Sequence, residues 1–174
     1  MKQMYDPEKH HRRSIRLKEY DYSRAGAYFV TVCTNNREYL FGNIVNDEAV
    51  LSEYGKIVEN VWYNLTGHYQ NIKLDKFIVM PNHIHGIIIL MNMDDVGAGF
   101  KPAPTDLTKY YPLSEIVRAF KTFSARHVNE LRITPGIPVW QRNYHEHIVR
   151  NENELNRIRE YIMNNPLRWQ FDRE

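Results

Sequence analysis

Residues 73–90 read KLDKFIVM-PN-HIHGIIIL, two runs rich in apolar and β-branched residues that are separated only by Pro81-Asn82. Runs of this length and composition are typical of β-strands, and a proline followed by an asparagine is turn chemistry. We therefore predict two antiparallel strands, at 73–80 and 83–90, joined as a hairpin. A hairpin in the middle of the chain favours a sheet that is mainly antiparallel.

Segments on both sides of this hairpin carry the patterns of further strands and helices. Apolar residues recur at helical spacing in three segments, and β-branched and aromatic residues mark two more strands. The predicted helices cover 51–65, 113–131 and 151–164, with Ser52 and Ser114 as N-caps, and the predicted strands cover 27–34 and 139–149. Gly42 and Asn46-Asp47 indicate turns. This order of elements predicts an α+β sandwich, a mainly antiparallel central sheet covered by helices.

Size and composition indicate one soluble domain over 1–174. Of the 174 residues, 43% are hydrophobic and 25% are charged, and the strongest apolar run, 87–91, is too short to cross a bilayer. The chain has one cysteine, Cys33, and no apolar leader follows Met1. We therefore expect neither disulfides nor export nor a membrane role, and favour the cytoplasm.

Two segments of the predicted domain lack periodicity. Residues 1–24 carry more basic than acidic side chains, whereas the formal net charge of the whole chain is only +2. Such a basic arm can hold phosphates, or it can be a solvated terminus. Prolines and glycines punctuate 94–112, which predicts a long flexible loop.

Two histidines of the hairpin are candidate metal ligands. Because residues two apart on a strand project from the same face, His83 and His85 present imidazoles about 7 Å apart at the backbone. Two such rings can converge on one divalent ion, and Gly86 would let a ligand's backbone approach the sheet closely. The motif alone is more often a pair of polar residues on a half-exposed strand, and His145 and His147 form a second pair of the same pattern.

The segment Pro81-Asn82-His83-Ile84-His85-Gly86 contains a histidine, a hydrophobic residue and a histidine in the order of a known family signature. Further matching segments lie at 13–17, 21–22, 28–31, 140–144, 148–152 and 158–166. Together they extend over nearly the whole chain and resemble the tyrosine HUH transposases, with the REP-associated branch most similar. Several separated matches in the expected order make this resemblance specific.

The resemblance implies a fold, a nucleophile and a metal site. The fold would be the ferredoxin-like HUH nuclease sandwich, Tyr161 would be the catalytic residue, and His83 and His85 would hold Mg²⁺ or Mn²⁺. Asn165 lies four residues after Tyr161, so on a continuous helix its amide oxygen would share that face and could be a third ligand. Pro166 opposes this placement, because the residue before a proline disfavours helical backbone.

The activity that the resemblance implies is cleavage and rejoining of single-stranded DNA. Tyr161 would attack a phosphodiester and form a 5′-phosphotyrosine link, which a 3′-hydroxyl later reverses without ATP. A phenol has a pKa of about 10, so it needs a base or a metal to react at neutral pH. Such a metal-dependent endonuclease and transposase is expected to recognise hairpin-containing, REP-like DNA. A monomer and a homodimer are both compatible with the family.

Basic side chains are expected to hold the phosphates, while aromatic side chains stack on unpaired bases. The candidates for phosphate binding are Arg12, Arg13, Arg16, Arg118 and Lys121. Each of these, taken alone, is as readily explained as a solvated charge.

Two other functions remain open at this point. A zinc hydrolase would join both histidine pairs, His147 included, in one site with Glu146 as the base. A non-catalytic, domesticated hairpin-binding protein would keep the fold without the chemistry. Tyr144, close to the second histidine pair, is a competing nucleophile, although a strand tyrosine beside Trp140 is better explained by packing.

Overall fold

The computed structural model describes residues 24–92 and 110–169. Arg12, Arg13 and Arg16 lie outside the described residues, as do nearly all of the predicted basic arm and most of the predicted loop at 94–112. Within the described parts, no helix is long and apolar enough to cross a membrane.

The centre of the fold is a four-stranded antiparallel sheet. Its strands are β1 (Gly26–Cys33), β4 (Ile72–Met80), β5 (His83–Leu90) and β6 (His145–Val149), in the order β4-β5-β1-β6. The predicted hairpin at 73–90 is β4 and β5. Helix α1 (Glu53–Tyr63) follows β1 and helix α3 (Leu113–Leu131) follows β5, so the strands and helices form the βαββαβ order of a ferredoxin-like sandwich. The predicted α+β class with an antiparallel sheet is confirmed.

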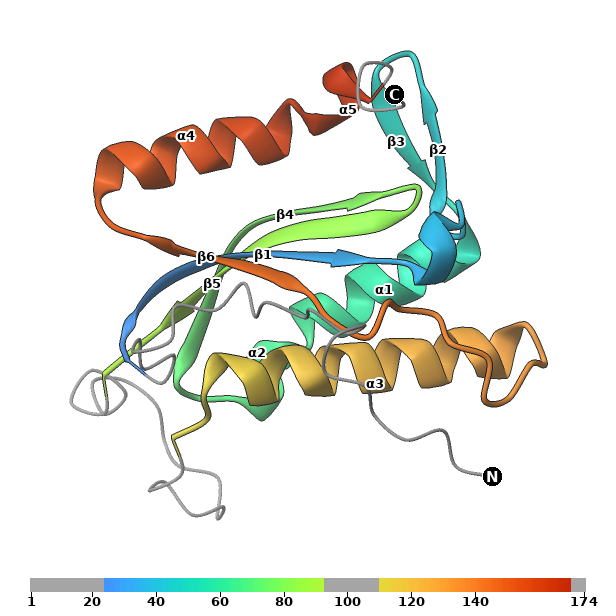
Figure 1. Cartoon of the computed structure of the whole chain (residues 1–174), viewed down its shortest axis with the longest axis horizontal. Coiled ribbons are helices and arrows are strands. Elements are labelled where there is room, and N and C mark those ends of the chain that lie inside the picture. The colour runs from blue at the N-terminus through green and yellow to red at the C-terminus, as the bar shows by residue number, and fades with distance from the viewer. Residues whose placement is uncertain (1–23, 93–109, 170–174) are drawn as a thin grey trace, which may run out of the picture.

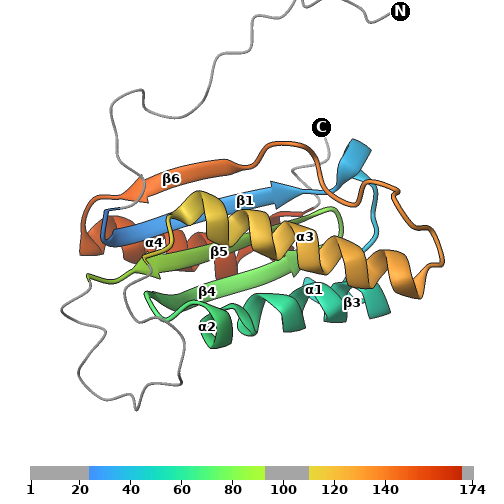
Figure 2. The same ribbon diagram turned by 90° about the horizontal axis from the view of Figure 1, so that it is seen from below.

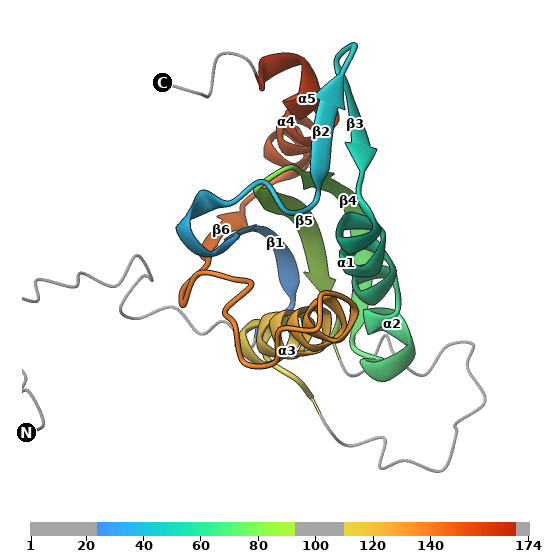
Figure 3. The same ribbon diagram turned by 90° about the vertical axis from the view of Figure 1, so that its right-hand side faces the viewer.

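Helices cover both faces of the sheet. Helices α1, α2 (Leu65–His68) and α3 lie on one face, and α4 (Glu152–Met163) lies on the other, as Figures 1 and 3 show from two sides. Seen from the α3 side, α3 lies in front of the strands and α4 lies behind them (Figure 2). The sheet is therefore the middle layer of three.

Strand β5 serves both layers because its side chains alternate between faces. Ile84 and Ile88 belong to the main core with α1 and α3, whereas Ile87 packs with Leu155 and Ile162 of α4. By the same alternation, His83 and His85 face the α4 layer. The pattern of β5, buried along nearly its whole length, is that of a central strand covered on both sides.

Gly86 has a different role from the predicted one. A Cβ at this position would lie 2.3 Å from the Trp62 ring, which stacks on Phe77 with ring centroids 4.4 Å apart. The glycine therefore admits the indole of α1 against the sheet. The expectation that it admits a ligand's backbone was wrong.

A second hairpin replaces the predicted turns after β1. Strands β2 (Gly42–Val45) and β3 (Glu48–Leu51) pair antiparallel around Asn46 and Asp47, which have φ values of 51° and 61°. This left-handed pair is the geometry of a tight hairpin turn, for which asparagine and aspartate are suited. The hairpin extends beyond the sheet beside α5 (Asn165–Arg168) (Figure 1).

Helix ends agree with the predictions in one case and differ in another. The Ser52 hydroxyl accepts a hydrogen bond from the Gly55 amide and caps α1 as predicted. Ser114 does not cap α3, because Pro112 occupies the N-cap position and Ser114 already lies inside the first turn. Proline is suited to a helix start, since it lacks the amide proton that would have no partner there.

The last predicted strand and helix are shorter than expected. Only His145–Val149 of the predicted 139–149 pairs in the sheet, while Trp140 forms an isolated bridge with Thr34 and donates its indole proton to Ser124. Helix α4 ends at Met163, before Asn165. Pro166 accounts for this break, and Asn165 starts the separate short helix α5.

Candidate active site

His83 and His85 lie side by side on β5, both almost fully buried beneath the α4 layer, with exposed fractions of 8% and 5%. Their Nε2 atoms are 3.1 Å apart and their ring centroids 4.5 Å apart. Two ring nitrogens aimed at each other from one strand form a two-nitrogen donor set. The two rings share one face, as their spacing on the strand predicted.

Two neighbouring side chains hold the rings by their other nitrogens. The Asn82 amide oxygen is 2.7 Å from Nδ1 of His83, so this nitrogen carries the proton and leaves the Nε2 lone pair available. The Thr31 hydroxyl of β1 lies 2.8 Å from Nδ1 of His85 and can accept the equivalent hydrogen bond. Metal-binding histidines are normally oriented by such partners on the nitrogen that is not bound to the ion.

Burial keeps both imidazoles neutral. Desolvation lowers the pKa of His83 to about 4, helped by the positive charge of Arg37, while a hydrogen bond with the Asn165 side chain acts in the opposite direction. Desolvation, followed by the charges of His83 and His145, lowers the pKa of His85 well below its ordinary value. A metal ligand must be unprotonated, and these histidines are unprotonated at neutral pH.

Asn165 places a buried side-chain amide beside this pair. The residue is 1% exposed and its side chain interacts with His83, yet neither amide atom has a well-formed hydrogen bond to the described residues. A buried amide that lacks a well-formed hydrogen bond is costly, so this group is suited to bind something that the protein alone does not provide. The residue reaches the site from α5, not from the face of α4 that carries Tyr161.

The donor set fits a hard divalent ion held weakly. Across 24–92 and 110–169, no three His, Cys, Asp or Glu side chains gather as a metal site. Two imidazole nitrogens and one amide oxygen carry no negative charge, so a phosphate oxygen would complete the shell favourably. Mg²⁺ and Mn²⁺ accept such oxygen ligands and open positions.

Tyr161 reaches the histidine pair from α4. Its hydroxyl is 3.4 Å from Nε2 of His85, and its ring packs edge-on against Phe29 with centroids 6.0 Å apart. The side chain is 36% exposed. It therefore touches the buried imidazoles on one side and solvent on the other.

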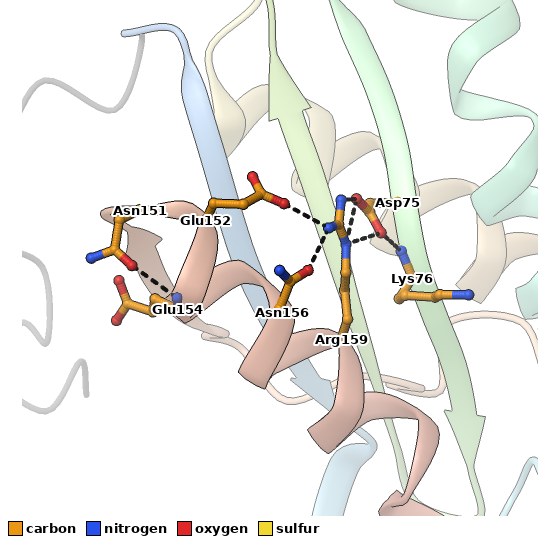
Figure 4. A network of polar contacts seen from close by, with 7 residues as sticks. All are labelled: Asp75, Lys76, Asn151, Glu152, Glu154, Asn156 and Arg159. Carbon is orange, nitrogen blue, oxygen red and sulfur yellow. Dashed lines mark hydrogen bonds and ion pairs between the residues drawn. The ribbon is translucent and has the colours of Figure 1, made fainter.

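Helix α4 is fixed by apolar packing and by an ion pair. Leu155, Ile158 and Ile162 face the sheet and pack in the smaller core cluster. Two residues before Tyr161, Arg159 extends to Asp75 on β4, with its Nε 3.1 Å from both carboxylate oxygens (Figure 4). The apolar packing and the ion pair together hold α4 against the sheet.

The beginning of α4 has its own contacts. The Asn151 side chain accepts a hydrogen bond from the Glu154 amide and caps the helix (Figure 4). Nε2 of His147 lies 2.8 Å from the Glu154 carboxylate, and the Arg150 amide donates to the same carboxylate. These contacts lower the pKa of Glu154, the Arg150 hydrogen bond first and the His147 hydrogen bond second. His147 thus connects β6 to α4 and is not part of the donor set around His83.

The zinc-hydrolase interpretation is not supported by these positions. Glu146 pairs with Val30 across β6 and β1, and Val30 belongs to the main core, so Glu146 faces away from the layer of His83 and His85. It cannot act as a base at that pair. Tyr144 packs against the main core, which agrees with the packing role favoured for it over a nucleophile.

The two described phosphate-binding candidates lie on α3, on the opposite face of the sheet from the histidine pair. Arg118 is exposed and paired with Glu115, and the Lys121 ammonium donates to the carbonyl oxygens of Gln141 and Arg142. Lys121 therefore has a structural role in holding the segment before β6. The fold does not bring either residue to the candidate site.

Several residues of the site were missed by sequence reasoning. Asn82 was visible only as a turn residue, although its position directly before His83 could have indicated a hydrogen-bonding partner. Thr31, Asp75 and Arg159 depend on strand register and helix placement, which no local pattern in the sequence reveals.

Known proteins resemble this chain in sequence and in structure. No family model matches the chain. An uncharacterised protein of Haemophilus influenzae is 40% identical over 171 residues, which cover 94% of this chain and 92% of the relative.

A solved structure of a REP-associated tyrosine transposase bound to a REP hairpin aligns with a TM-score of 0.57 and 19% identity, over 88% of this chain and 74% of that one. A second solved structure, from Deinococcus radiodurans R1, has 16% identity and a TM-score of 0.47 over 87% of this chain and 97% of that one, which is too low to support a conclusion.

Proposed function

We propose that this chain, which belongs to one family with the Haemophilus influenzae protein and shares its fold with a REP-associated tyrosine transposase, is a tyrosine HUH transposase. Its activity would be metal-dependent cleavage and rejoining of single-stranded DNA. The substrate would be hairpin-containing DNA, since the transposase of similar fold is bound to a REP hairpin.

One observation carries the proposal: the Tyr161 hydroxyl lies 3.4 Å from a ring nitrogen of the paired His83 and His85. Tyr161 and His85 are 76 positions apart in the chain and lie in different layers, yet their reactive atoms meet at one point. Twelve tyrosines are present in the sequence, so the location of this one beside two metal-suited imidazoles supports a nucleophile.

His83, His85 and Asn165 would hold Mg²⁺ or Mn²⁺. The bound ion would polarise the scissile phosphodiester and orient it for in-line attack. Asn82 and Thr31 keep the two imidazoles in the orientation that this task needs. Because the imidazoles are buried and neutral, they do not compete with the ion for protons at neutral pH.

Tyr161 would attack the phosphorus. Its oxygen forms a bond to phosphorus while the bond from phosphorus to the 3′ oxygen of the neighbouring nucleotide breaks. The phenolic proton is released and the leaving 3′ oxygen takes up a proton, so the products are a 5′-phosphotyrosine link and a free 3′-hydroxyl. Attack by another 3′-hydroxyl reverses the step and joins DNA without an external energy source.

The position of Tyr161 supports action within one chain. The hydroxyl already lies at the histidine pair of its own chain, so no exchange of α4 between two copies is required. Mixing a His83→Ala chain with a Tyr161→Phe chain is therefore expected to yield no covalent product. Recovery of the product would show that the tyrosine acts in a second copy.

The decisive experiment is incubation with labelled single-stranded hairpin DNA and Mn²⁺, followed by denaturing electrophoresis. We expect a denaturant-resistant protein–DNA adduct that is lost in Tyr161→Phe and retained in the control Tyr144→Phe. His83→Ala and His85→Ala should also lose the adduct, while His147→Ala should be milder because it only joins β6 to α4. Tight hairpin binding without an adduct, over varied hairpins and metals, would favour the non-catalytic DNA-binding function instead.

A further inference from the structure

A short turn beside the histidine pair has a costly backbone. The 3-10 helix η1 (Asn35–Arg37) follows the end of β1, and both Asn36 and Arg37 have left-handed φ values, 52° and 58°. Two consecutive non-glycine residues in this region are unfavourable, most clearly for an arginine. Such strain persists where the surrounding structure holds it in place, which occurs most often at binding and catalytic sites.

Thr34 holds this turn against the histidine pair. Its side chain is fully buried, and its hydroxyl lies 2.8 Å from the Glu38 carbonyl oxygen and 3.0 Å from that of Asn82. The Thr34 amide also donates to the Asn82 carbonyl oxygen at 2.9 Å. Since Asn82 orients the neighbouring His83, one set of hydrogen bonds fixes both the turn and the imidazole.

Arg37 places a positive charge at this point. Its side chain is exposed and forms no ion pair or hydrogen bond with another described residue. Arg37 belongs to the turn that Thr34 holds against Asn82, the residue before His83, so its charge lies on this side of the histidine pair. A cation near two metal-suited nitrogens would oppose a bare metal ion. An anion that contacts both the ion and the guanidinium removes this repulsion, so the arrangement suits a phosphate.

An aromatic path leads outward from the same place. Trp169, which is buried, lies with its ring centroid 6.0 Å from that of His83. Its other neighbour is Tyr39, whose ring centroid is 5.5 Å away and whose side chain is 51% exposed. Tyr39 is thus a solvent-facing ring supported from beneath by a buried indole, two residues after Arg37. Unpaired bases stack on such rings independently of their sequence.

We propose that Arg37 and Tyr39 bind the unpaired DNA strand next to the cleavage point. Arg37 contacts a phosphate beside the histidine pair, and Tyr39 stacks on an adjacent base. This inference rests on the proposed function and assigns the strand to the η1 side of the site, instead of the α3 side where Arg118 and Lys121 lie. Recognition here is of single-stranded backbone and base planes, not of base sequence.

The test measures DNA binding without chemistry, in a Tyr161→Phe background with Mn²⁺. The probes are a hairpin oligonucleotide with an unpaired thymidine tail and the same hairpin without the tail. Binding of each probe is measured by fluorescence anisotropy over a series of salt concentrations. For Arg37→Gln we expect about tenfold weaker binding of the tailed probe and a salt slope lower by about 1. Tyr39→Leu should weaken binding about tenfold with an unchanged salt slope, because it removes stacking and no charge.

Matched variants separate this surface from general effects. Arg37→Lys should keep the salt slope, because it retains the charge, and Arg118→Gln on α3 should bind as the parent protein does. Unaltered binding of the tailed probe by both Arg37→Gln and Tyr39→Leu would overturn the inference, and so would equal losses on the probe without a tail. If the wild-type protein instead binds no hairpin and forms no adduct, the proposed function itself fails.

Discussion

Arg159 of α4 and Asp75 of β4 form a two-atom ion pair, with Nε 3.1 Å from both carboxylate oxygens and a terminal nitrogen 2.5 Å from Oδ2. Asp75 lies where the pairing of β4 with β5 shifts register between Leu74 and Phe77. Such an irregularity redirects side chains locally. The ion pair therefore connects a bulge in the sheet to the helix that carries Tyr161.

Breaking this pair should misplace the nucleophile more than it weakens DNA binding. In Arg159→Gln, α4 loses a contact that holds it against the sheet, and a displacement of about 1 Å can reduce a rate about 10²-fold. We expect slower adduct formation with nearly unchanged hairpin affinity, measured by single-turnover electrophoresis and anisotropy. The exchanged double variant Asp75→Arg with Arg159→Asp should recover part of the rate. A parallel loss of affinity would instead indicate a DNA contact by Arg159.

The same pair makes stability depend on acid pH. The hydrogen bond from Arg159, ahead of the other contributions, lowers the pKa of Asp75 below its ordinary value of 3.8. A lowered pKa in the folded state means that the stabilisation is present above about pH 4 and is lost as the pH falls through the folded-state value. At pH 7 we expect the wild-type protein to unfold at a higher urea concentration than Asp75→Asn. At pH 3 this difference between the two unfolding midpoints should shrink. A constant difference would contradict the ionic origin.

Removing the partners of the imidazoles should weaken metal binding without removing a ligand. Thr31→Val and Asn82→Ala delete the groups that face Nδ1 of His85 and Nδ1 of His83. The expected loss of Mn²⁺ affinity is about 10- to 100-fold, read by titration with electron paramagnetic resonance. Thr122→Val on α3 is the matched control and should have no effect. An affinity equal to wild type in both variants would show that the ring orientation is fixed by packing alone.

Two glycines should respond to alanine in opposite directions. A Cβ at Gly86 would meet the Trp62 ring at 2.3 Å, so Gly86→Ala must displace the indole and should cost about 1–3 kcal/mol or more. At Gly67, in α2, no described atom beyond its chain neighbours and its own helix backbone lies within 4 Å of the added Cβ, and the change should stabilise the protein by about 0.5–1 kcal/mol through helix propensity. Thermal unfolding measures both. A neutral Gly86→Ala would mean that the Trp62 packing is readily rearranged.

The sequence predicted helices and strands well where the pattern of apolar residues is uninterrupted along the whole element. The hairpin at 73–90 and the helix at 113–131 have uninterrupted patterns, and the structure has β4, β5 and α3 at nearly these limits. The hairpin of β2 and β3 was missed because its strands are only four residues long and alternate weakly. Ser114 was wrongly chosen as a cap because a serine is a common cap residue, whereas the N-cap position falls at Pro112, two residues earlier.

The sequence by itself determined the strand that carries His83 and His85, because their spacing on an extended backbone requires a common face. It also indicated Tyr161 through a resemblance that extends over nearly the whole chain. Only the tertiary structure decided which residues complete the site. Asn165 reaches the histidines from a separate helix, and Glu146 faces the opposite layer, because strand register and helix docking depend on contacts between residues far apart in the chain.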